Sequence, residues 1–125
     1  MDRHAHLGTL RICNWILGAL ACCVALVFLL VWCLPGLLAI LHGEAIGWVF
    51  LIGGLAFGGL AGGLGWLHFR AATGTVLGKR RLLQSVLAIL HVVNIPIGTA
   101  FAVYTLWVCW FHQPTKVFFD IHDDR

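Results

Sequence analysis

Histidine is the residue of this sequence whose chemistry is most suggestive. The chain has seven histidines in 125 residues, and an imidazole can hold a proton near neutral pH or ligate haem iron. Two of them, His68 and His91, lie in apolar stretches. His91 follows Arg81 by ten residues, which is about 15 Å along a helix and close to the middle of a bilayer. An ionisable side chain at that depth is a candidate functional group.

Two roles for His91 follow from its position. It can be a single axial ligand to haem or chlorophyll, or a neutral residue bonded to a backbone carbonyl or to Asn94. A haem held by two histidines needs both at one depth, and we expect His68 to lie at the end of its helix, beside Arg70. We therefore predict no cofactor, with His91 as the one candidate ligand.

Other catalytic or metal-binding patterns are missing from the sequence. None of the cysteines forms a Cys-x-x-Cys pair; they are Cys13, Cys22, Cys23, Cys33 and Cys109. The pair His4 and His6 has no cluster of cysteines or carboxylates beside it. No Ser, His and carboxylate can be assembled into one site. We predict a protein that is not an enzyme and that has neither catalytic residues nor a metal site.

The composition places the chain in a lipid bilayer. Hydrophobic residues make up 61% and charged residues 10%, whereas soluble domains have roughly 25% charged residues. Three uncharged stretches, 12–43, 45–69 and 82–115, are each longer than the roughly 20 residues that a membrane helix needs. The basic residues flank these stretches and form no stripe with aromatic residues. The lipid bilayer is therefore the expected partner, and nucleic acid is not.

These stretches predict an all-α, polytopic transmembrane bundle in one domain, 1–125. The expected helices are 7–34, 45–69, 79–93 and 97–112, with a short tail at 113–125. The pair Pro35-Gly36 is expected to end the first helix. Because Arg3, Arg11 and the 79–81 cluster are basic, we expect the N-terminus to be cytoplasmic.

The third stretch is too long to be one straight membrane helix. Its 34 residues would measure about 51 Å, against a hydrocarbon core of roughly 30 Å. A helix break is expected at Asn94, Pro96, Gly98 and Thr99. The chain would then turn back, which gives four helices with both termini cytoplasmic. The alternative is three helices, with the last one kinked at Pro96.

Glycine is concentrated in the second expected helix. Spacings of four residues align small side chains on one side of it and let another helix approach closely. The predicted packing residues are Gly54, Gly58, Gly59, Gly62 and Gly63. This pattern favours packing against copies of the chain or against another membrane protein.

Two features of the second half form a recognisable pattern. The basic run GKRR at 78–81 is followed by an apolar segment and then by NIPIGTAFAVYTLWV at 94–108. This pattern resembles a family of small uncharacterised bacterial four-helix membrane proteins, whose signature reads approximately Phe-Pro-x-Gly-Thr-x-x-Gly-x-Tyr-x-Leu-Trp-Val-Leu. Ile95 and Ala102 depart from it.

The resemblance extends to both ends of the chain. His6-Leu7-Gly8 is similar to the start of family members, and QPTKVFF at 113–119 looks like their short Pro-led helix. The resemblance implies four helices, a cytoplasmic C-terminus and the bacterial cytoplasmic (inner) membrane. It implies no activity.

The expected function is to pack against other protein chains in the membrane. The leading hypothesis is a non-catalytic multi-pass membrane protein that self-associates as a homo-oligomer or joins a larger membrane complex as an accessory subunit. The alternatives are a carrier of haem or chlorophyll through His91 and a small oligomeric transporter or channel.

Overall fold

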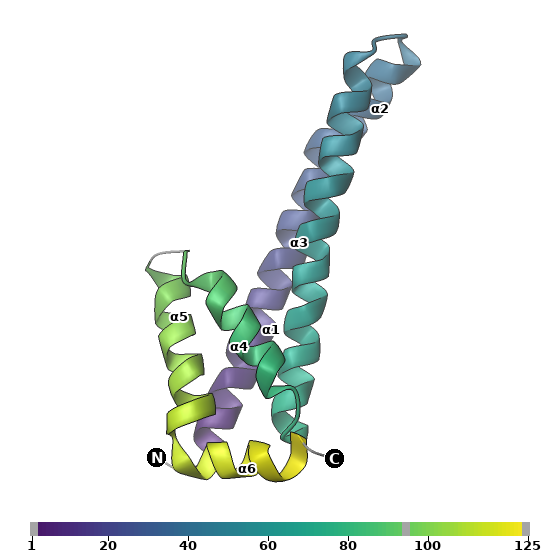
Figure 1. Ribbon diagram of the computed structural model, residues 1–125. Coiled ribbons are helices and arrows are strands. Elements are labelled where there is room, and N and C mark those ends of the chain that lie inside the picture. The colour runs from purple at the N-terminus through teal and green to yellow at the C-terminus, as the bar shows by residue number, and fades with distance from the viewer. Residues whose placement is uncertain (1–2, 94–95, 124–125) are drawn as a thin grey trace. The chain divides into compact units, whose positions relative to one another are not determined.

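The computed structural model describes residues 3–93 and 96–123, and these residues form helices without any strand (Figure 1). This confirms the all-α class. The elements are α1 (Arg3–Phe28), the π-helical turn η1 (Leu29–Cys33), α2 (Leu34–Leu41), α3 (Ile46–Leu77), α4 (Arg81–His91), α5 (Ile97–Leu106), the π-helical turn η2 (Trp107–Phe111) and α6 (Gln113–Asp123).

The number of helices differs from the prediction of four. In the described residues, α1, η1 and α2 follow one another without a break, and so do α5 and η2. The described residues therefore form five helices. They form two compact units: residues 17–66 make one, and residues 1–16 with 67–125 make the other. The helix that begins with α1 and the helix α3 each contribute to both units.

The first helix passes Pro35, where we expected it to end. The chain adopts the wider π-helical turn η1 before Pro35, which then sits in the first turn of α2. Pro35 lacks an amide donor, and a π-helical turn is the kind of irregularity by which a continuous helix accommodates it. The helix ends at Leu41 instead, and Gly43 follows with φ of +81° and an amide that donates to the carbonyl of Ile40.

Helix α3 also runs further than the predicted end at residue 69. Its stop is a glycine cap, because Gly78 has φ of +65° and the amide of Lys79 donates to the carbonyl of Gly74 at 2.9 Å. This is the arrangement by which a left-handed glycine closes the last turn of a helix. The segment 71–78, predicted as a connector, is therefore almost wholly helical.

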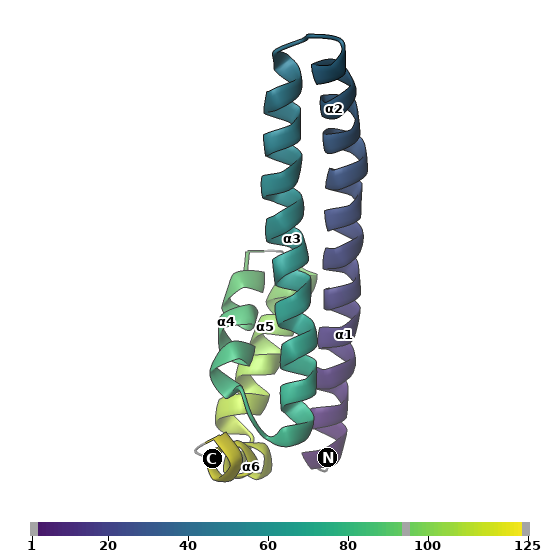
Figure 2. The same cartoon turned by 90° about the vertical axis from the view of Figure 1, so that its right-hand side faces the viewer.

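The stretch 82–115 turns back, as α4 and α5 lie side by side (Figures 1 and 2). Pro96 occupies the position before α5, and the hydroxyl of Thr99 donates to the carbonyl of Val92 at 2.9 Å. That bond satisfies one of the carbonyls left over at the end of α4. Gly98 is buried, whereas Asn94 lies outside the described residues.

The expected tail is the helix α6, which contains the short Pro-led segment implied by the resemblance. Its first turn holds Pro114, and the carbonyl of His112 accepts from the amide of Lys116 at 2.9 Å. Phe119 is fully buried in a cluster with Leu10 and Val108. Within this unit, α6 runs crosswise to α4 and α5 (Figure 1).

An ion pair fastens α6 to α4. The guanidinium of Arg81 is paired with Asp120 and lies 3.7 Å over the ring of Trp110. The indole of Trp110 in turn donates to the hydroxyl of Ser85 at 2.9 Å. A mostly buried cation is thus held by a carboxylate and an aromatic face, two interactions that favour arginine over lysine.

Glycines of α3 allow close packing of the two helices in the unit 17–66. A Cβ atom added at Gly47, Gly54, Gly58 or Gly65 of α3 would lie within 3.4 Å of residues between Gly18 and Ile40. The intervals of seven, four and seven residues place these glycines on one face of α3. The two helices of this unit run side by side along its length (Figure 2).

Two continuous helices have the length and apolar composition to cross a membrane. They are 4–41 and 46–77, whereas 81–91 and 97–111 are apolar but shorter. In the most apolar part of the two long helices, only 11% and 17% of the residues are buried. The apolar side chains of these helices therefore face outward.

The glycine contacts predict opposite effects for one substitution at two sites. Gly47→Ala would place a methyl group 2.5 Å from the carbonyl oxygen of Gly36 and should lower the free energy of unfolding by about 1–3 kcal/mol. Gly59→Ala is the matched control, because nothing lies within 4 Å there, and it should be neutral or stabilising by up to about 1 kcal/mol. Denaturation in mild detergent, followed by circular dichroism, measures both. Equal effects would contradict the assigned contact face.

Candidate functional site

A buried network of polar side chains joins three helices in the unit of residues 1–16 and 67–125. Asn14 of α1, His68 of α3 and Gln84 of α4 are each fully buried. The amide nitrogen of Asn14 donates to the carbonyl of Leu10 at 2.9 Å and to Oε1 of Gln84 at 3.0 Å. Nε2 of Gln84 donates to the carbonyl of Ala71 at 2.8 Å, and Oδ1 of Asn14 lies 2.9 Å from Nδ1 of His68.

The network assigns the tautomer of His68. A backbone carbonyl can only accept, so the bond to Ala71 orients the amide of Gln84 and makes its Oε1 an acceptor. Asn14 must then donate to Gln84, and its remaining oxygen accepts from His68. Nδ1 of His68 therefore holds the proton. Its Nε2 is a buried lone pair without a hydrogen-bond partner among the described residues.

A second histidine lies against the first. The ring centroids of His68 and His91 are 4.9 Å apart in an edge-to-face arrangement, with the ring of Phe101 beside both. Nδ1 of His91 lies 2.9 Å from the carbonyl of Leu87 and must donate to it. In its neutral form His91 therefore also has an unprotonated Nε2. The site thus contains two imidazoles, and each donates its Nδ1–H to a hydrogen bond within the protein.

This pair can accept a proton or bind a ligand at nitrogen. It is not spaced for a haem between the two rings, since metal–nitrogen bonds of roughly 2 Å would hold axial imidazole centroids about 6 Å apart. No group of three or more His, Cys, Asp or Glu side chains within the described part of the chain could hold a metal ion. Single axial ligation by His91 stays a hypothesis, and its bond to Leu87 is of the kind expected for a structural histidine.

The proximity of His68 and His91 differs from the sequence-based expectation, which put His68 at a helix end. The reason is the length of α3, which continues to Leu77. His68 is thus nine residues from the end of α3, about 14 Å, and His91 is ten residues beyond Arg81, about 15 Å. The glycine cap at Gly78 was the signal that could have revealed this.

Another pair of histidines, His6 and His112, lies at the start of α1 and just before α6 in the same unit. His6 is 5% exposed and its Nδ1 lies 2.9 Å from the hydroxyl of Tyr104. Its ring centroid is 4.6 Å from that of His112, whose Nδ1 lies 2.8 Å from the hydroxyl of Thr115. These contacts join the start of α1 to the connection between η2 and α6.

The predicted packing glycines divide into two groups. Gly54 lies against Cys33, and Gly58 lies against Leu29, both within the chain. Gly62 is in ordinary contact, with a Cβ there 3.7 Å from Ala25. At Gly59 and Gly63, which are exposed, a Cβ would meet nothing within 4 Å. The spacing of four did not distinguish these groups, and it missed Gly47 and Gly65, which pack closely.

Comparison of the chain with protein-family models, with curated proteins and with solved structures finds no match. The resemblance to a four-helix membrane family therefore stays a prediction, and the site is interpreted from its own residues.

The tautomers can be tested directly by magnetic resonance. In the nitrogen-15 spectrum of histidine-labelled protein, His68 and His91 should show protonated Nδ1 and unprotonated Nε2, the reverse of the preference of free histidine. The variants His68→Gln and His91→Gln assign the signals. Exposed His42 is the internal control and should show a protonated Nε2. An Nε2–H signal from His68 would contradict the network.

Proposed function

We propose that this chain is a non-catalytic integral membrane protein that serves as a packing subunit. The observation that supports insertion most directly is the exposure of its apolar side chains, such as Leu60 at 72% and Ile52 at 63%. A soluble protein buries its most apolar helices, and water would oppose an apolar surface of this extent. In a bilayer, lipid tails cover the same surface.

The charge distribution agrees with insertion of the unit 17–66. It has one charged residue, Glu44, and no Lys or Arg. Its α3 portion, 46–66, contributes 21 uncharged residues, about 31 Å of helix, to the segment proposed to be inserted. Glu44 lies in the connection between α2 and α3, at one end of this span.

The hairpin of α4 and α5 is proposed to enter the bilayer and return. Its arms of 11 and 15 residues are about 17 Å and 23 Å long and too short to span separately. Exposed apolar residues near its tip, such as Val93 at 85%, favour contact with lipid. The amphipathic α6 runs crosswise to it and suits the interface, with exposed Val117 and Ile121. This arrangement keeps both termini cytoplasmic.

The packing role rests on the glycines that the chain leaves open. Gly59 and Gly63 are four residues apart on an exposed face of α3, and exposed Ala56 continues that face. In lipid, such small residues let a second helix approach closely and gain dispersion contacts. We propose that this face binds another copy of the chain or a larger membrane complex of the bacterial cytoplasmic membrane.

The double substitution Gly59→Leu and Gly63→Leu tests the packing role. It should weaken self-association or partner co-purification in mild detergent about tenfold or more, because leucine keeps helix backbones apart. Ala19→Leu, at an exposed alanine of α1, adds bulk to another exposed helix surface and should have no effect. Gly58→Leu should lower stability instead, because Gly58 contacts Leu29. Unchanged assembly in the double variant, measured by sedimentation and cross-linking, would refute the proposal.

The topology is tested by labelling single cysteines in a background without native cysteines. Gln113→Cys, at an exposed polar residue of α6, should react with a membrane-impermeant reagent only after the cytoplasmic side is opened, whereas Glu44→Cys should react in intact cells. The control is a lysed sample, in which both must react. Labelling of residue 113 from outside would exclude a cytoplasmic C-terminus.

A further inference from the structure

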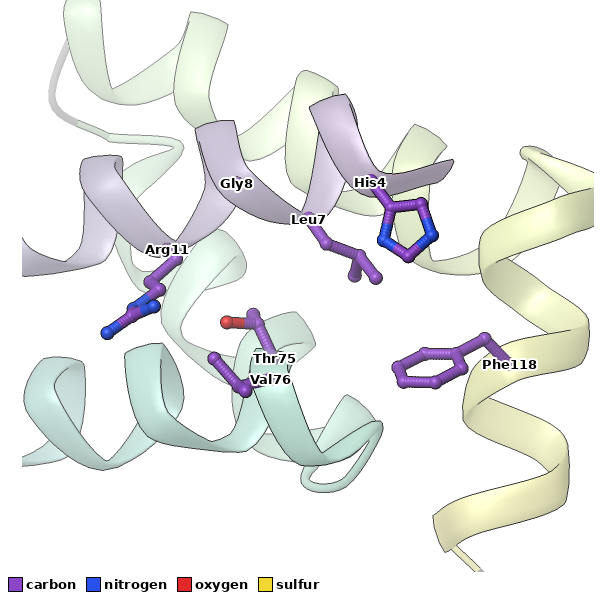
Figure 3. Close-up of a pocket in the computed structure, with 7 residues that line it drawn as sticks. All are labelled: His4, Leu7, Gly8, Arg11, Thr75, Val76 and Phe118. Atoms are coloured by element: carbon purple, nitrogen blue, oxygen red, sulfur yellow. The ribbon is translucent and has the colours of Figure 1, made fainter. Parts of the chain in front are cut away.

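A cavity of about 360 Å³ lies between the start of α1, the end of α3 and α6. In Figure 3, Leu7 of α1 and Phe118 of α6 point into the same space, Val76 of α3 forms the side below, and Arg11 stands at the end away from Phe118. All lining residues belong to the unit of residues 1–16 and 67–125. The volume is within the range of small-molecule sites.

The polar groups of the cavity favour an anion. Among the residues that the structure describes, its lining includes Arg11 and His4 but no Asp or Glu. The hydroxyl of Thr75 also borders the cavity, but it donates to the carbonyl of Ala72 at 2.6 Å. Arg11 is exposed and presents a planar fork of N–H donors, which matches the oxygens of a phosphate group.

The unit that contains the cavity is positively charged, as Arg11 is. All eight Lys and Arg residues of the chain lie in this unit, together with four Asp residues, which gives it a formal net charge of +4. The other unit has Glu44 alone and a net charge of −1. An acidic ligand is thus attracted to the unit that contains the cavity.

The apolar walls distinguish a lipid from a free anion. Leu7, Val76 and Phe118 can cover glycerol and the first methylenes of an acyl chain, but they offer nothing to a hydrated inorganic ion. Val76 and the adjacent Leu77 are each 56% exposed and extend the apolar surface along α3. The amphipathic α6 forms one wall, and such helices lie at the level of lipid headgroups.

We propose that this cavity binds the phosphate group of an acidic phospholipid, with Arg11 as its principal ligand. The inference rests on the proposed insertion in a bilayer. Gly8 borders the cavity, and a Cβ atom added there would have nothing within 4 Å. A larger side chain at this position would therefore begin without a clash and take up space within the site.

The full-length protein, purified in mild detergent, is titrated with phosphatidylglycerol or with phosphatidylcholine, and bound lipid is counted by native mass spectrometry. Phosphatidylglycerol should bind more tightly. Arg11→Gln and Gly8→Leu should each weaken its binding about tenfold or more, the first by loss of charge-assisted hydrogen bonds and the second by occlusion. Lys79→Gln removes one positive charge outside the cavity and should change binding less than about threefold.

Two measurements keep the outcomes separate. Thermal unfolding of the variants shows that they fold, and extraction of cell membranes with alkaline carbonate reports insertion independently of lipid binding. Wild-type affinity in both cavity variants, with the protein still membrane-embedded, would overturn this inference and leave the proposed function intact. Release by carbonate would overturn both. Displacement of phosphatidylglycerol by inorganic phosphate at equal concentration would assign the site to a free anion and refute the lipid.

Discussion

The structure depends on one constraint, which is that the chain has very few groups able to face water and must satisfy its backbone internally. From residue 12 to residue 69 the only charged side chain is Glu44. In the proposed bilayer, a chain of this kind would have no water for free amides and carbonyls, and helices satisfy these groups within each segment. The described connections between helices are accordingly short. Gly43 and Gly78 adopt positive φ to close helix ends with backbone hydrogen bonds.

The same constraint explains why the polar side chains gather inside one unit. Asn14, His68 and Gln84 would be costly against apolar surroundings, and each forms a hydrogen bond with another helix or with a backbone carbonyl. Because each of these bonds joins specific atoms, a shift of α1, α3 or α4 along its axis would leave a buried group unpaired. Packing of apolar side chains alone is tolerant of such shifts. The network thus specifies the register of three helices and the orientation of the His68 ring, whereas the His91 ring is oriented by the carbonyl of Leu87.

Sequence patterns gave the apolar helices, the reversal after α4 and the residue type that packs, but they placed the helix ends poorly. Charged residues were used as boundaries, whereas the chain ends its helices with caps. Pro35 was expected to stop a helix and instead follows a π-helical turn, and Arg70 was expected to follow α3 although the cap comes at Gly78. The misplaced end of α3 led directly to the wrong depth for His68. The segment 113–125 was predicted as a tail because it is charged. It contains the helix α6 instead, in which Thr115 and Phe119, four residues apart, form a buried face.

Glycine has two separable uses on α3, and the angular position of each residue decides between them. Successive residues differ by about 100° around a helix, so Gly58 and Gly59 cannot serve the same neighbour. Gly58 faces the chain's own first helix, whereas Gly59 has open space. In the proposed bilayer, lipid would supply little drive for one apolar helix to pack on another, so close approach at small residues would have to provide it. A helix with glycines on two faces can therefore pack against the chain's own first helix with one face and leave the other face open for a second protein. In a chain that acted alone, the exposed glycines of the second face would lower the stability of α3 without gaining a contact, because glycine has low helix propensity.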